Sequence, residues 1–195
     1  MPKKTSMKLA ANEYLKAVAE IRGYLLVTNG LVEPYWSWTA DHAVILLYRE
    51  FEKMILTMLT AAINQDTATI SGTTGIEFPK HMNKDVCQYL IVGDGYFDFK
   101  GRDGLIKILK GYMPDNHFLL AIVSDKTYST PLDQLSALRN FATHDSSISK
   151  LKAYEATGNQ KLVSAGRWLR AEGRFEALCE SLDDLVRKLA KRAPY

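Results

Sequence analysis

The chain contains few of the residues from which metal centres and disulfide frameworks are built. Among its 195 residues are only two cysteines and four histidines. Cys87 and Cys179 do not form a metal-binding motif, and no two histidines have the spacing of metal ligands. We therefore expect no metal site and no cofactor. The same cysteine usage fits a reducing compartment, so we expect a cytoplasmic protein.

Long apolar segments are also absent. The longest apolar runs, such as 43–48 and 118–123, are much shorter than the roughly 20 residues that a membrane helix needs. The N-terminus is basic, but no apolar signal-peptide core follows it. These absences predict a protein with no membrane segment.

The charge of the chain is small but unevenly distributed. The net charge is +3, and 24% of the residues are charged, which is ordinary for a globular protein. From residue 139 to residue 174 the chain has seven basic residues against three acidic ones, an excess of +4. The basic residues of this stretch are Arg139, Lys150, Lys152, Lys161, Arg167, Arg170 and Arg174. Such an excess is compatible with RNA as a partner, and equally with an ordinary solvated surface.

Apolar residues recur at helical spacing along most of the chain. They form one face of the segment 14–25 and a broad stripe over 44–62, which we expect to begin after Thr39 as an N-cap. A last helix is expected over about 172–190, where apolar residues alternate in steps of three and four, as in a bundle. We therefore predict an all-α, up-and-down helical bundle that forms a single domain over residues 1–195.

The segment of about 65–104 departs from this pattern, and we predict an irregular insertion between the core helices. Its residues 89–99 are compatible with a short hairpin. Gly93 and Gly95 suggest a dinucleotide-binding turn, but Asp98 occupies the position of the third glycine. Turn glycines are the better interpretation.

Arg139, Asn140 and His144 are the candidate catalytic residues. They follow one another within six residues, near the end of a helix that we expect to begin with Thr130 as N-cap and Pro131 at its first position. An arginine can hold a phosphate through two parallel hydrogen bonds, and a histidine can transfer a proton near neutral pH. Together they can cleave a phosphodiester without a metal ion.

Each of these residues also has a structural interpretation. Arg139 can form a surface ion pair with Asp133 or Asp145, and His144 can cap the carbonyl end of its helix. In a regular helix Arg139 and His144 would lie about 140° apart. A helix break after Thr143, or a second copy of the chain, would be needed to bring them to one phosphate.

The stretch that begins at Leu135 and contains Arg139-Asn140 and His144 resembles the R-polar-x(4–6)-H motif of the HEPN superfamily. The segments 48–52 and 164–169 are also similar to the bacterial ribonuclease branch of that superfamily. The resemblance implies a metal-independent endoribonuclease. Such an enzyme activates the ribose 2′-hydroxyl, so that RNA is cut to 2′,3′-cyclic phosphate ends and DNA resists.

The resemblance further implies a homodimer in which the two motifs face each other, in a toxin–antitoxin or anti-phage setting with a possible antitoxin protein. A tyrosine that one subgroup carries two residues after the histidine is replaced here by Ser146, so regulation through that tyrosine is not expected. Lys150 is a weak candidate for substrate binding, and Glu50 is of interest because the helix that bears it is expected to face the motif. The alternatives are a non-catalytic HEPN-type dimerisation module that binds a nucleotide or a protein, and an unrelated helical scaffold.

Overall fold

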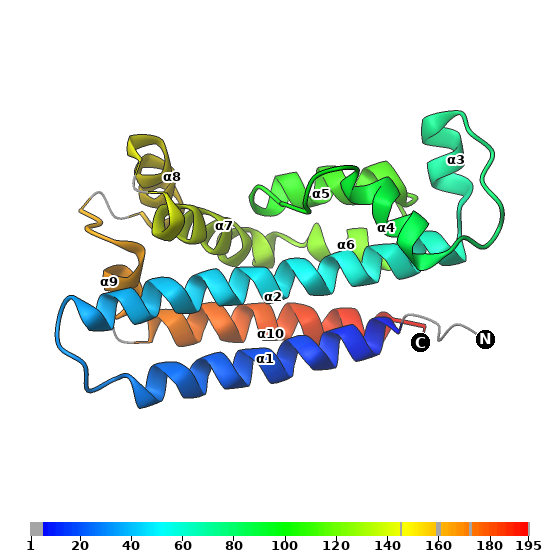
Figure 1. The fold of residues 1–195 in the computed structure, drawn as a ribbon. Coiled ribbons are helices and arrows are strands. Elements are labelled where there is room, and N and C mark those ends of the chain that lie inside the picture. The colour runs from blue at the N-terminus through cyan, green and yellow to red at the C-terminus, as the bar shows by residue number, and fades with distance from the viewer. Residues whose placement is uncertain (1–5, 145, 159–160, 172, 195) are drawn as a thin grey trace.

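The computed structural model describes residues 6–144, 146–158, 161–171 and 173–194. In these ranges the chain forms ten α-helices and one 3-10 helix, and it has no β-strand (Figure 1). The predicted all-α fold is confirmed. Among the same residues, no helix combines the length and the apolar character that crossing a membrane would require.

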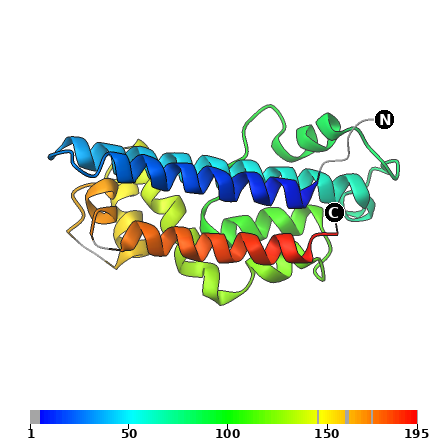
Figure 2. The ribbon, with the colours of Figure 1, turned by 90° about the horizontal axis from the view of Figure 1, so that it is seen from below.

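Four helices form an up-and-down bundle. Helices α1 (Met7–Val27), α2 (Tyr35–Gln65) and α10 (Arg174–Arg192) are long and lie side by side, and α1 runs in the direction opposite to α2 and α10 (Figures 1 and 2). Helix α7 (Ser129–Thr143) contacts both α2 and α10 and closes the bundle. The candidate motif therefore stands on a core helix.

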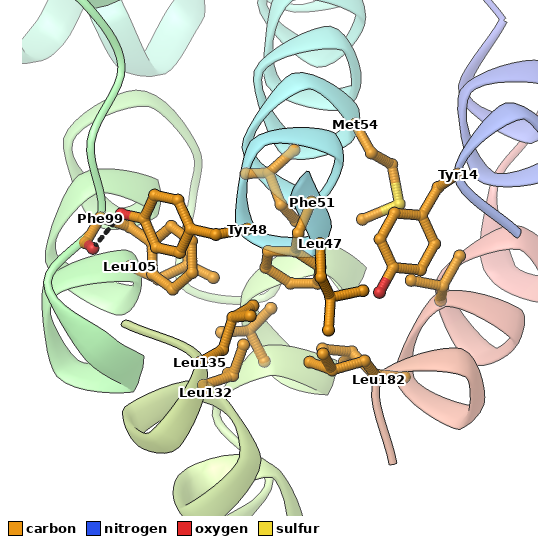
Figure 3. Close-up of a cluster of buried hydrophobic side chains, with 14 of the residues drawn as sticks. Tyr14, Leu47, Tyr48, Phe51, Met54, Phe99, Leu105, Leu132, Leu135 and Leu182 are labelled. Atoms are coloured by element: carbon orange, nitrogen blue, oxygen red, sulfur yellow. Dashed lines mark hydrogen bonds between the residues drawn. The ribbon is translucent and has the colours of Figure 1, made fainter. Parts of the chain in front are cut away.

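The core lies where these four helices meet (Figure 3). Leu47 and Phe51 of α2, Leu135 of α7 and Leu182 of α10 are each fully buried, and Tyr14 of α1 packs edge-on against Phe51 at 5.8 Å between ring centroids. The buried residues of each helix recur every three or four positions, which places them on one face of that helix. Each such side chain contributes about 1.5–3 kcal/mol through burial.

Helix α2 begins earlier than the sequence pattern predicts. Its first residue is Tyr35, four residues before the predicted N-cap Thr39, so residues 35–38 form about one additional helical turn. Thr39 is not an N-cap: it lies within the helix, and its hydroxyl donates to the carbonyl oxygen of Trp36 at 2.7 Å. A threonine hydroxyl can bond the preceding turn of a helix as readily as it can cap one.

Helix α7 also begins before its predicted cap. It follows directly on the 3-10 helix η1 (Lys126–Tyr128), so Thr130 lies inside α7 and is not its N-cap. The side chain of Asp125 accepts the Thr127 N–H at 2.9 Å at the start of η1. The observed start of α7 is earlier than the predicted one because a turn of 3-10 helix continues into the α-helix without an intervening loop.

The predicted insertion is helical, and the predicted hairpin is wrong. It contains α3 (Ala68–Thr74) and α4 (Lys84–Val92), and α5 (Gly101–Tyr112) begins at its end. Helix α4 is capped by the Asn83 side chain, which accepts the Asp85 N–H at 2.9 Å, and it ends at Gly93 with a φ of 57°. The apolar run that suggested a strand is too short to distinguish a strand from one buried helix face.

Short helices complete the two ends of the molecule. Helix α6 (Phe118–Val123) packs on α5 and α10, whereas α8 (Ser147–Thr157) and α9 (Ala165–Leu169) lie at the end where the α1–α2 connection also lies (Figure 1). Helix α9 packs so closely on α2 that Gly166 contacts the α2 backbone, and its N–H donates to the Asp41 carboxylate at 2.6 Å. Burial raises the pKa of Asp41 to about 6, and the bond from Gly166 acts in the opposite direction.

Candidate active site

The helix that carries the motif ends between Arg139 and His144. Helix α7 stops at Thr143, and His144 is its C-cap in an extended conformation, with φ −128° and ψ 103°. The His144 N–H donates to the carbonyl oxygen of Asn140 at 2.9 Å, so this backbone bond closes the last turn. The break that the motif requires is present, and the His144 side chain is exposed.

The backbone of His144 is held firmly although its ring is free. The Ser146 N–H donates to the His144 carbonyl oxygen at 2.8 Å, and the Ser149 hydroxyl donates to the same oxygen. Ser146 and Ser149 also form a capping box that begins α8. In the described part of the chain the imidazole makes no hydrogen bond and no ring contact. Both of its nitrogens are therefore open to a ligand.

Arg139 lies in a polar cluster rather than on the open surface, with only 20% of its side chain exposed. Its guanidinium carbon stands 4.3 Å from the centre of the Tyr48 ring, a cation–π contact with α2. One guanidinium nitrogen donates to the amide oxygen of Asn140 at 2.7 Å, and another lies 3.9 Å from the Asp98 carboxylate. Of the two acidic partners considered in the structural interpretation of Arg139, Asp133 forms no ion pair with it among the described residues, and Asp145 lies outside them.

The loop 93–100 places Asp98 beside Arg139. The Tyr48 hydroxyl lies 2.6 Å from the Asp98 carboxylate. It also lies 2.8 Å from the Phe99 carbonyl oxygen, a hydrogen bond drawn in Figure 3. The rings of Tyr48 and Phe99 stack at 4.8 Å, and burial raises the pKa of the Tyr48 hydroxyl far above its usual range, so it stays a donor. The approach of loop and helix is therefore set by one buried tyrosine.

Asp133 attaches the same loop to α7 from the other side. Its carboxylate accepts the Arg102 N–H at 2.8 Å and the Ser129 hydroxyl at 3.2 Å, so a side chain of α7 caps the first turn of α5. Lys100, the residue at the N-cap position of α5, makes no side-chain cap bond of its own. Asp133 acts as a structural cap and is not available to the motif.

Glu52, not Glu50, is the carboxylate of α2 that faces the motif. The helix that bears Glu50 does contact the motif helix α7, but Glu50 itself pairs with Arg49 at 2.9 Å and Lys53 at 3.7 Å. Burial raises the pKa of Glu52 to about 7, and the charge of Arg139 acts in the opposite direction. Its Oε1 is buried and has no hydrogen-bond partner among the described residues. Near neutral pH this carboxyl group can therefore hold or release a proton.

A cleft of about 490 Å³ opens beside Asn140, between α7, α8 and the end of the loop 93–100. Its lining is polar and of mixed charge: Asp98, Lys100, Gly101, Asp133, Ser136, Ala137, Asn140, Lys152, Glu155 and Ala156. The Asn140 amide oxygen is occupied by Arg139, which leaves the NH₂ group as a donor toward a ligand. A cleft of this volume and polarity can hold a nucleoside.

The structure brings Arg139 and Asn140 together but does not join them to His144. No hydrogen bond or ring contact in the described residues links the imidazole to either side chain. Lys150 stands one turn into α8, with its ammonium 5.8 Å from the centre of the Tyr154 ring, and is half-buried. Among the described residues of one chain, the Arg139–Asn140 pair and the His144 ring are therefore not in direct contact.

The guanidinium has donors to spare. Of the five N–H donors of an arginine, Asn140 uses one within the residues that the structure describes, and the 3.9 Å separation from Asp98 is too long for a hydrogen bond. Within the described residues, no three histidine, cysteine or carboxylate side chains converge as metal donors. The cluster therefore contains one oriented cation, Arg139, with two acidic residues near it, Asp98 and Glu52.

Sequence reasoning missed Tyr48, Glu52 and Asp98. One signal was available for the first two, because Tyr48 and Glu52 stand four residues apart on α2 and so share the face of a mostly apolar stripe. A carboxylate there needs a partner, and a cation elsewhere in the chain is the natural one. No local pattern singles out Asp98, which lies in an irregular loop.

No protein-family model, no curated protein and no solved structure matches the chain.

Proposed function

We propose that this protein is a metal-independent endoribonuclease of the HEPN type. The observation that carries the proposal is the placement of Arg139. Its guanidinium is held in one orientation by the Tyr48 ring and Asn140, keeps most of its donors uncommitted, and lies one turn from a helix end that presents an exposed histidine. A fixed cation that still has free donors can bind a phosphodiester without reorganising, which favours the transition state.

The proposed reaction begins with proton removal from the ribose. Neutral His144 takes the proton of the 2′-hydroxyl, and the 2′-oxygen attacks the adjacent phosphorus. The bond from phosphorus to the 5′-oxygen breaks, that oxygen receives a proton, and a 2′,3′-cyclic phosphate remains. Arg139 offsets the negative charge that develops on the phosphoryl oxygens, and Asn140 holds Arg139 and donates its NH₂ group to the substrate.

A second chain completes the proposed site. Because Arg139 and His144 are not joined within one chain, we place the motifs of two copies face to face, as the HEPN resemblance implies. Two histidines then stand near one phosphate, one to remove the 2′-proton and one to protonate the leaving oxygen. The cellular role that fits this activity is that of a cytoplasmic toxin or anti-phage effector, restrained by an antitoxin protein.

Asp98 and Glu52 are proposed as positioning residues. Asp98 lies 3.9 Å from the guanidinium and Glu52 interacts with its charge, so both carboxyl groups favour its observed orientation and lower its net attraction for a phosphate. A phosphate that accepts two parallel hydrogen bonds from Arg139 would compete well with Asp98, which stands 3.9 Å away. Substrate binding should therefore lengthen the contact of Arg139 with Asp98.

The test is cleavage of a mixed-sequence single-stranded RNA in excess EDTA. Wild-type protein is expected to leave cyclic-phosphate ends, and His144→Ala and Arg139→Ala are each expected to lose at least 100-fold in rate. His81→Ala removes another exposed histidine, far along the chain, and should cleave as the wild type does. Activity that survives His144→Ala, or that appears only with added metal, would refute the mechanism.

The second candidate is a non-catalytic HEPN-type module that binds a nucleotide or a protein. It is favoured by the two carboxyl groups near Arg139, Asp98 and Glu52, whose negative charge opposes the binding of a phosphate there. In this case wild-type protein would bind RNA or a nucleotide in the cleft beside Asn140, no cleavage would occur, and His144→Ala would leave the affinity unchanged.

A further inference from the structure

A second pocket meets the cleft beside Asn140 at Asp98, which lines both of them. Its volume is about 460 Å³, and it lies between α3, the end of α4, the loop 93–100 and α5. Helices α3, α4 and α5 all lie on one side of α2, the side that also carries α7 (Figure 1). The pocket is therefore continuous with the candidate active site.

The walls of this pocket are mainly apolar, unlike the polar lining of the cleft beside Asn140. Ile70 is buried, and Ile91, Phe97 and Ile108 are each half-buried, so part of their apolar surface is open to the pocket. A ligand that covers this surface removes it from water, which favours binding. The pocket therefore suits a ligand with apolar faces.

Hydrogen bonds within the protein hold the walls of the pocket in place. The Tyr112 hydroxyl of α5 donates to the Leu90 carbonyl oxygen at 3.0 Å and so joins α5 to the end of α4. On α3 the Thr74 hydroxyl donates to the Ile70 carbonyl oxygen at 2.7 Å. A pocket whose walls are already fixed loses little freedom when a ligand binds.

Two exposed side chains stand at the mouth of the pocket. Tyr96 lines it although its side chain is 82% exposed, and its ring makes no ring contact among the described residues. Lys107 is also exposed and forms no ion pair with a carboxylate in the part of the chain that the structure describes. The pocket thus offers an aromatic face and an ammonium donor, the groups that bind the face and the edge of a nucleobase.

The pocket is within one nucleotide of the position proposed for the scissile phosphate. Tyr96 and Asp98 are two residues apart, so their Cα atoms are at most about 7 Å apart. The Asp98 carboxylate in turn lies 3.9 Å from the Arg139 guanidinium. The base and the phosphate of one nucleotide are separated by a similar length. A strand whose phosphate binds Arg139 can therefore place one neighbouring nucleoside in each of the two hollows.

We propose that the pocket lined by Tyr96, Phe97 and Lys107 binds the base of a nucleotide next to the phosphate that Arg139 holds. That the ligand is an RNA strand rests on the proposed ribonuclease function, whereas the affinity for a base rests on the pocket. The base packs against the two aromatic rings, and a carbonyl oxygen at its edge accepts from Lys107. Uracil and guanine carry such an oxygen and adenine does not, so the pocket favours the first two.

The test is a binding titration that does not depend on cleavage. The probe is a fluorescent hexamer of 2′-O-methyl uridine, which has no free 2′-hydroxyl and cannot be cut by the proposed reaction. Tyr96→Ala removes the aromatic face, and its matched control is Tyr89→Ala, at a tyrosine of α4 that is 58% exposed and lies outside the pocket lining. Lys107→Ala is matched by Lys110→Ala, at another exposed lysine of α5.

A second probe with the same phosphates but with abasic sugars isolates the contribution of the bases. Tyr96→Ala should weaken binding of the uridine hexamer about tenfold, and Tyr89→Ala less than about twofold. With the abasic probe, Tyr96→Ala should change the affinity less than about twofold. Lys107→Ala should weaken binding of the uridine hexamer more than Lys110→Ala does, and this difference should disappear with the abasic probe.

Three outcomes would overturn the proposal. The wild type does not bind the uridine hexamer, Tyr96→Ala binds it as the wild type does, or Tyr96→Ala loses the same affinity for both probes. Free uridine that binds more tightly than the hexamer, and that is lost in Tyr96→Ala, would overturn the assignment to an RNA strand.

Cleavage of natural RNA separates this proposal from the ribonuclease function. A wild type that binds the hexamer through its bases at Tyr96 but cleaves no natural RNA would refute the ribonuclease function and leave the base site standing. Conversely, cleavage by the wild type together with equal affinities of the wild type and Tyr96→Ala for the hexamer would refute the base site alone.

Discussion

Gly166→Ala tests the closest contact in the fold, the one between α9 and α2. A Cβ atom at residue 166 would overlap the Ser37 carbonyl oxygen and stand 2.9 Å from the Asp41 backbone nitrogen. Real Cβ atoms do not approach other atoms so closely, and both neighbours belong to the backbone of a long helix, so they cannot turn aside. The substitution must therefore move α9 away from α2.

The expected loss has two parts. Overpacking in a well-packed interior costs about 1–3 kcal/mol, and a backbone neighbour places the value near the top of that range. Moving α9 also lengthens the 2.6 Å bond from the Gly166 N–H to Asp41, and a hydrogen bond to a charged group contributes about 1.5–3 kcal/mol. We expect Gly166→Ala to lower the free energy of unfolding by about 3–5 kcal/mol.

Urea unfolding followed by circular dichroism measures this free energy. Gly23→Ala is the matched control, because Gly23 is exposed inside α1 and a Cβ there meets nothing within 4 Å. It should stabilise the protein by about 0.5–1 kcal/mol through the higher helix propensity of alanine. Asp41→Ala, which removes the acceptor alone, should account for about 1.5–3 kcal/mol. If Gly166→Ala unfolds within about 0.5 kcal/mol of the wild type, the close approach of α9 to α2 is wrong.

Three further predictions concern the cluster around Arg139 and the core. Burial raises the pKa of Glu52 to about 7, so the folded protein keeps a proton that the unfolded chain has released. The free energy of unfolding should therefore fall as the pH rises from about 4.5 to 7. In urea titrations at several pH values, this fall should be smaller by on the order of 1–2 kcal/mol in Glu52→Gln than in the wild type. An equal dependence of the free energy of unfolding on pH in both proteins would contradict the burial argument. Tyr48→Phe should lower stability by about 1–3 kcal/mol because Asp98 and the Phe99 carbonyl oxygen lose their shared donor, and an unchanged urea midpoint would show that this contact is not formed. Leu182→Ala should cost about 2–5 kcal/mol, whereas Leu151→Ala, at a side chain that is 56% exposed, should cost less than about 0.5 kcal/mol in the same assay.

The helices themselves follow from local sequence. The apolar spacing in α1, α2 and α10 predicted each of them, because burial of one face repeats every three or four residues whatever the partner. The starts of α2 and α7 were predicted wrongly, because the Thr39 hydroxyl bonds within α2 instead of capping it, and because the 3-10 helix η1 continues directly into α7 before Thr130. The run Tyr89–Phe99 was predicted as a hairpin because a short apolar stretch fits strand and helix equally well.

The adjacency of Arg139 and Asn140, and the end of α7 just before His144, are local properties that the sequence by itself determined. The partners of Arg139 were decided only by the tertiary structure. Asp98 is 41 residues away from Arg139 along the chain and reaches it because Tyr48 and Asp133 hold the loop against α2 and α7. Thr74 of α3 and Lys107 of α5 line one pocket for the same reason, since α3 packs on α5 and α5 packs on α7. A local pattern specifies which face of a helix is buried, but which distant side chain meets it depends on how the helices pack.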